Sequence, residues 1–179
     1  SVKHRCEHTD GLAESLAQLD APKKPVFIYV GRVAVEKNLG DFLDLNLPGE
    51  KHIVGDGPAL KALKSKYPGV VFHGAHSMEN LPSFYNRADV FVFPSRTDTF
   101  GLVLLEAMGC GLPVAAFPVT GPIDVVGESG AGALNHDLEK ACLDALKIDR
   151  KTVRMHAETF SWEAATALFF GHLTKIREP

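Results

Sequence analysis

The sequence contains little cysteine and no uninterrupted apolar run of membrane-spanning length. Its three cysteines among 179 residues, Cys6, Cys110 and Cys142, are widely spaced and form no Cys-x-x-Cys pair. Such an odd set fits reduced thiols better than a disulfide framework. No stretch approaches the length needed to span a bilayer, and the N-terminal residues lack the apolar core of a signal peptide. These absences predict a cytoplasmic protein.

The chain also lacks a run of charge of one sign, an internal repeat and a low-complexity tract. Its 19 basic and 22 acidic residues give a formal net charge of -3, and no basic run is present. This argues against a surface for nucleic acid, so any positive site must be small and local. With 45% apolar residues, the chain has enough length and apolarity for one sizeable core.

Several kinds of site are disfavoured because their residue patterns are missing. The eight histidines show no metal-ligand spacing, so no metal is expected. Ser95 lacks the flanking glycines of a nucleophile elbow, which makes a hydrolase triad improbable. The first strand-to-helix junction, Gly31-Arg32, contains no Gly-x-Gly-x-x-Gly, which disfavours an NAD enzyme.

Short β-branched or aromatic runs alternate regularly with helical segments. The expected strands are 26–30, 52–54, 70–73, 90–93, 113–117 and, more weakly, 131–134. The expected helices are 39–45, 59–67, 79–87, 102–108, 123–127, 138–146, 152–159 and 162–176. Near-continuous apolar strands are typical of a parallel sheet that is covered on both faces. The sequence therefore predicts an α/β fold, a single Rossmann-like domain with a doubly wound parallel sheet of about six strands and a helical C-terminal tail. Residues 1–25 are expected to be a connector and residues 26–179 the domain.

Ligands of such sheets bind outside the carboxyl ends of the strands. The segments that follow the first five strands therefore carry the functional information, and four of the five contain glycine: 31–32, 55–58, 74–75, 94–98 and 118–122. Glycine lets the backbone come close to a ligand. We expect a ligand along this edge.

Arg32 and Lys37 place two cations in the loop after the first strand. An arginine fork, a mobile lysine and free N–H groups at a helix start would suit a diphosphate. The alternative for this segment alone is a solvated loop in which Lys37 pairs with Glu36.

Glu106 is the only charged side chain between Asp98 and Asp124. A carboxylate on a helix that is apolar on every face requires a ligand or another partner. Asp98 precedes this helix, so the two carboxylates would address different parts of one extended ligand. The alternative makes Asp98 a helix cap and Glu106 a buried partner of Arg32 or Lys37.

Read together, five motifs in register resemble the C-terminal half of a retaining, nucleotide-sugar-dependent glycosyltransferase of the GT-B type. The motifs are Tyr29-Val30-Gly31-Arg32 with Glu36-Lys37, Val54 to Pro58, Val71 to Gly74, Ala88 to Ser95, and Asp98 to Pro113. Their order and spacing match over residues 26 to about 175, including the closing Phe160-Ser161-Trp162-Glu163. Each motif alone is weak. Their order on successive strand ends makes the resemblance specific.

The resemblance implies a role for each candidate residue. Arg32 and Lys37 would bind the diphosphate of a UDP-sugar or GDP-sugar donor and stabilise the departing nucleoside diphosphate. Glu106 would hydrogen-bond the ribose, and Asp98 would face the transferred sugar. The resemblance also implies backbone contacts with the donor at the remaining positions. These are Gly31, Gly55 and Gly57 in the loops, His73, Gly74 and Ala75 near the nucleoside base, and Phe100, Gly101, Leu102 and Val103 near the diphosphate. No metal is usually required in such enzymes.

Two departures from the family pattern bear on function. The family usually has glutamate at the position of Asp98, and it has an N-terminal acceptor-binding domain that these 179 residues cannot contain. The chain is therefore expected to bind a donor but to be inactive alone. Membrane acceptors are common for such enzymes, although no amphipathic basic helix is evident. Two alternatives stay open, a GT-B-fold sugar-nucleotide epimerase and a non-catalytic interaction module.

Overall fold

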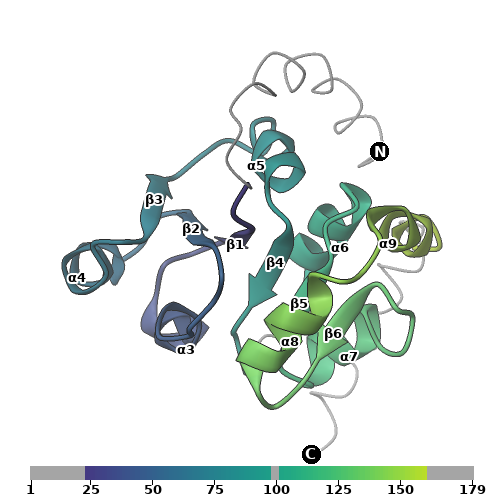
Figure 1. Cartoon of the computed structure of the whole chain (residues 1–179). Helices are drawn as coiled ribbons and strands as arrows, with labels where there is room; N and C mark the ends of the chain where they lie inside the picture. The colour runs from purple at the N-terminus through teal and green to yellow at the C-terminus, as the bar shows by residue number, and fades with distance from the viewer. Residues whose placement is uncertain (1–22, 98–100, 161–179) are drawn as a thin grey trace, which may run out of the picture.

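The computed structural model describes residues 23–97 and 101–160. Its centre is a six-stranded, all-parallel sheet with the strand order β3-β2-β1-β4-β5-β6 (Figure 1). The strands are β1 Val26–Val30, β2 Glu50–Val54, β3 Val71–Gly74, β4 Val90–Phe93, β5 Val114–Ala116 and β6 Gly132–Leu134. The predicted doubly wound parallel sheet is thus confirmed.

The inner strands bury side chains on both faces of the sheet. In β1, Ile28 and Val30 belong to one core cluster, whereas Phe27 and Tyr29 belong to the other. Successive strand residues point to opposite faces, so a strand that is apolar throughout needs a helical layer on each side. This explains why the strand runs could be read from apolar continuity alone.

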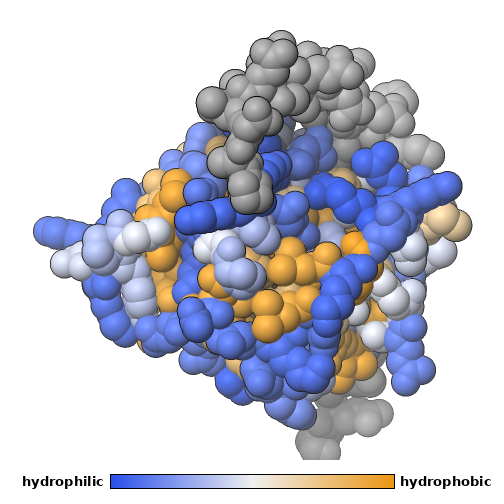
Figure 2. Space-filling view, in the orientation of Figure 1, coloured by the Kyte–Doolittle hydropathy of each residue, from blue (hydrophilic) through white to orange (hydrophobic). Residues whose placement is uncertain are grey.

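The helices divide into two layers. The short helix η3 (Val35–Lys37) buries no side chain and leads into α3 (Leu39–Leu43). Side chains of α3, α4 (Leu60–Lys66) and α8 (Leu138–Ala145) lie on the face of Phe27. Side chains of α5 (Leu81–Arg87), α6 (Leu102–Gly109), α7 (Thr120–Val125) and α9 (Arg150–Ala157) lie on the face of Ile28. Figure 2 shows mostly hydrophilic side chains around a smaller apolar area, as expected when helices cover both faces of the sheet.

Aspartates and one arginine fix the C-terminal helices. The side chains of Asp137 and Asp149 accept hydrogen bonds from Lys140 N and Thr152 N, so they cap α8 and α9. Arg150 donates from its guanidinium to the carbonyls of Ala88 at 2.6 Å, Cys110 at 3.2 Å and Tyr85 at 3.3 Å. Arg150 therefore ties α9 to the ends of α5 and α6.

Two expectations need correction. The helix expected at 123–127 lies at Thr120–Val125, because Val119 is an extended N-cap and Pro122 fits the first turn. Cys110 is disulfide-bonded, so the prediction of reduced thiols is wrong for this residue, whereas Cys142 is free and buried. The helix expected at 162–176 and the connector over 1–22 lie outside the described residues. Within those residues, no helix combines the length and apolarity that crossing a membrane requires.

Candidate functional site

The carboxyl ends of β1 and β4 mark the point where the chain changes direction in the sheet. From β1 the chain moves outward through β2 and β3, and it returns on the other side of β1 to form β4 (Figure 1). The connection after β1 packs on one face and the connection after β4 on the other. Parallel sheets bind ligands in the crevice at such a switch point.

Hydrogen bonds join the loops after β1, β2 and β3 into one rim. Gly31 N donates to Val54 O at 3.0 Å, Val33 N to Asp56 O at 2.9 Å, and Ala59 N to Val33 O at 3.1 Å. Further out, the amide of Gly55 donates to Gly74 O at 2.7 Å. The structure thus brings the glycine-containing candidates of these three loops together on one edge.

Two of these glycines serve the packing of the rim itself. Gly55 has φ +139°, and a Cβ atom there would lie 1.9 Å from the carbonyl oxygen of Gly31. A Cβ at Gly57 would lie 2.3 Å from the carbonyl oxygen of Val33. Gly74, with φ +78°, has no atom within 4 Å of its Cβ position. Glycine at 55 and 57 therefore lets one loop approach another loop, which the sequence pattern did not distinguish from approach to a ligand.

Arg32 lies exposed in the rim, and Lys37 is half-buried in η3. The hydroxyl of Tyr29 donates to the Arg32 carbonyl at 2.9 Å, which fixes the backbone beneath the guanidinium. Arg32 Nη1 lies 3.5 Å from Glu36 Oε1, with both side chains more than half exposed. A solvated pair of this kind contributes little stability, so exchanging Glu36 for another anion costs little.

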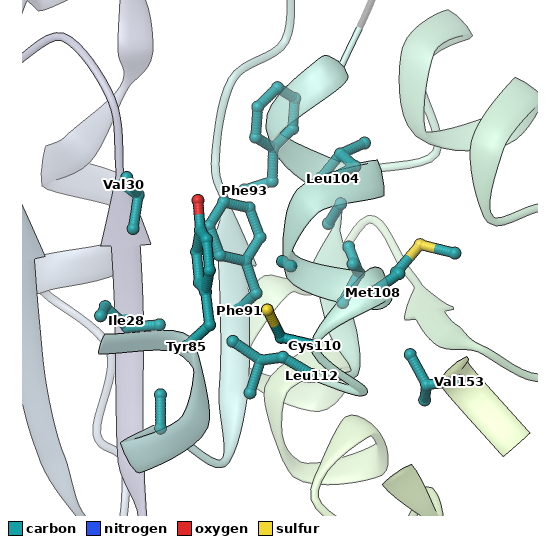
Figure 3. Close-up of a cluster of buried hydrophobic side chains, with 14 of the residues drawn as sticks. Ile28, Val30, Tyr85, Phe91, Phe93, Leu104, Met108, Cys110, Leu112 and Val153 are labelled. Atoms are coloured by element: carbon teal, nitrogen blue, oxygen red, sulfur yellow. The ribbon is translucent and has the colours of Figure 1, made fainter. Parts of the chain in front are cut away.

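Glu106 is half-buried on α6 and contacts Tyr85 of α5. The Tyr85 hydroxyl donates to Glu106 Oε2 at 3.4 Å. Burial, together with the charge of Glu106, raises the pKa of Tyr85 far above its ordinary value, so the hydroxyl remains a donor. Figure 3 shows the Tyr85 oxygen beside Val30 and Phe93, at the carboxyl ends of β1 and β4. This contact places the Glu106 carboxylate near the switch point.

The start of α6 supplies the remaining candidates. The Gly101 carbonyl accepts from Leu104 N at 2.8 Å, Leu102 is half exposed, and Val103 packs partly against the core. Asp98 and Phe100 lie outside the described residues, so their roles stay predictions.

A chain of polar side chains across β2 and β3 was not predicted from the sequence. His73 Nε2 lies 3.1 Å from His52 Nδ1, and His52 Nε2 lies 3.1 Å from Glu50 Oε2. Burial lowers the pKa of His73, and His52, His76 and Arg87 lower it further. The alternation of Glu50 and His52 along one face of a strand is the signal that could have revealed part of this chain. Among the described residues, no three histidine, cysteine, aspartate or glutamate side chains lie close enough together to hold a metal ion.

The fold defines a class of protein, the doubly wound α/β domains with a parallel sheet. More particularly, the chain belongs to the family described as Glycosyl transferases group 1, whose model matches residues 24–147.

Relatives with known names agree with this family. The chain is 36% identical over 176 residues to the sulfoquinovosyl transferase SQD2 of Arabidopsis thaliana, covering 87% of this chain and 33% of that protein. It is 31% identical to a D-inositol 3-phosphate glycosyltransferase of Mycolicibacterium paratuberculosis, covering 87% of this chain and 41% of that protein. The chain therefore spans well under half the length of these two relatives.

Solved structures show the same fold, which is half of a GT-B architecture. The lipopolysaccharide outer core galactosyltransferase WaaB superposes with a TM-score of 0.69 at 21% identity, over 88% of this chain and 51% of WaaB. A sucrose-phosphate synthase of Thermosynechococcus elongatus gives 0.65 at 29% identity, over 91% of this chain and 48% of that enzyme.

Proposed function

We propose that this chain is the donor-binding domain of a glycosyltransferase that moves a sugar from a nucleoside diphosphate sugar to an acceptor with retention. One observation carries the proposal. The hydrogen-bonded rim after β1, β2 and β3 presents Arg32 at the switch point, and Tyr85 holds Glu106 at the same end of the strands. A cationic and an acidic group at one edge of the sheet match a ligand with a diphosphate and a ribose.

Each group has a separate task in the proposed reaction. Arg32 and Lys37 neutralise the diphosphate and stabilise the charge that develops on the departing nucleoside diphosphate. Glu106 accepts hydrogen bonds from the ribose hydroxyls, and Asp98 faces the transferred sugar. The backbone at His73–Ala75 holds the base, and amides at Phe100–Val103 assist the diphosphate. No metal ion is needed in this scheme, because the two cations supply the charge stabilisation.

The names of relatives support a sugar nucleotide as the ligand. One relative, from Mycobacterium tuberculosis, is a GDP-mannose-dependent alpha-mannosyltransferase, 38% identical over 113 residues. We propose that a second, acceptor-binding domain completes the enzyme, that the chain alone transfers nothing, and that the enzyme works in the cytoplasm.

Isothermal titration of the chain with UDP and GDP tests this function. One of the two diphosphates should bind at concentrations below about 1 mM, whereas uridine and guanosine should bind far more weakly because they lack the diphosphate. A folded chain that binds neither diphosphate at millimolar concentration would refute the proposal. Circular dichroism of the same sample should first show that the chain is folded, because only then is the absence of binding decisive.

A further inference from the structure

Arg96 joins three segments at the switch point. It lies just after β4, and its guanidinium carbon is 3.8 Å from the centre of the Phe117 ring. Phe117 directly follows β5 and is buried. From this position Nη2 and Nε of Arg96 approach Asp41 Oδ2 at 3.1 and 3.4 Å. Asp41 lies in the first turn of α3.

Asp41 is coupled through the backbone to the cationic loop after β1. Its amide donates to the Asn38 carbonyl at 3.0 Å, and the amide of Asn38 donates to Val35 O at 3.1 Å. Lys37 lies within the turn that the second of these hydrogen bonds closes. The contact between Arg96 and Asp41 therefore joins the ends of β4 and β5 to the segment that carries Lys37.

Global stability does not explain this bridge. The side chains of Arg96 and Asp41 are 51% and 45% exposed, and solvated pairs of this kind contribute little to the free energy of unfolding. The stack on Phe117 instead holds the planar guanidinium in one orientation, and both donors meet a single carboxylate oxygen. Such an arrangement determines position more than it determines stability.

We propose that Arg96 is a positioning residue of the donor site. Through Asp41 it holds the loop carrying Arg32 and Lys37 in place relative to the ends of β4 and β5 before the diphosphate arrives. This inference rests on the proposed function. Preorganised cations bind an anion more tightly because less ordering remains to occur on binding.

The test measures binding of UDP, GDP and the corresponding nucleosides to the wild-type chain and four variants. Arg96→Met and Asp41→Asn each remove the ion pair, their combination completes a double-mutant cycle, and Lys140→Met is a matched control. Lys140 forms an exposed ion pair with Asp144 on α8. Arg96→Met and Asp41→Asn should each weaken diphosphate binding by about threefold or more, and the double variant should lose little beyond either single variant. Nucleoside binding and the melting temperature should change little in these variants. Lys140→Met should bind the diphosphate as the wild type does.

The sign of the Asp41→Asn effect separates positioning from direct contact. If Arg96 instead gripped the phosphate itself, removing the competing Asp41 carboxylate would tighten diphosphate binding, and that result would overturn the inference. Unchanged binding in Arg96→Met, or losses that simply add in the double variant, would overturn it as well. Absence of binding by the wild-type chain would instead refute the proposed function on which the inference rests.

Discussion

Replacing Gly55 with alanine should damage the rim that joins the loops after β1 and β2. The added Cβ would lie 1.9 Å from the Gly31 carbonyl oxygen, and the backbone there has φ +139°. Holding an L-residue at positive φ costs about 1–2 kcal/mol, and forcing atoms into a packed site costs about 1–3 kcal/mol. We therefore expect the free energy of unfolding to fall by about 2–5 kcal/mol, a large part of a typical domain's stability.

Urea unfolding followed by circular dichroism measures this loss, with Gly40→Ala as the matched control. Gly40 lies in α3 and has no atom within 4 Å of its Cβ position, so alanine there should stabilise the protein by about 0.5–1 kcal/mol. If Gly55→Ala proved as stable as the wild type, the two loops would not pack as closely as this account requires.

Two further predictions concern other parts of the fold. Arg150→Met should lower the free energy of unfolding by about 2–4 kcal/mol, because three backbone carbonyls lose a charged donor. The exposed Arg154→Met is the control, and an equal loss in both variants would contradict the role of Arg150 in holding α9. The pKa of His73 is lowered in the folded state, so the unfolded chain binds more protons between that lowered value and the usual value near 6.5. The free energy of unfolding should therefore fall as the pH drops through about 6.5. His73→Gln should remove part of this fall, whereas the exposed His136→Gln should not. Equal pH profiles for the two variants would refute the contribution of His73.

Much of the sheet could be predicted because its signal is local. Strands such as Val26–Val30 and Val90–Phe93 were predicted with the observed bounds, since burial on both faces leaves an uninterrupted apolar run. Helix ends were less accurate where proline and an extended cap compete with apolar periodicity, as at Thr120. The partner of Arg32 was also not predicted, because Glu36 lies within reach of Arg32 as well as beside Lys37.

The candidate site could be predicted only in part because several of its contacts are not local. Glu106 was found from its apolar neighbours, yet its contact with Tyr85 joins residues 21 positions apart. Arg96 gave no signal in the sequence, because Asp41 is 55 positions away and Phe117 follows a different strand. Neighbouring charges along the chain cannot show which groups a parallel sheet brings together at its edge.

The most direct test of the central claim compares nucleoside diphosphate and nucleoside binding in Arg32→Ala and the wild type. If Arg32 binds the diphosphate, its loss should weaken UDP or GDP binding by about tenfold or more, while uridine or guanosine binding stays nearly constant. Equal losses for the diphosphate and the nucleoside would contradict the account.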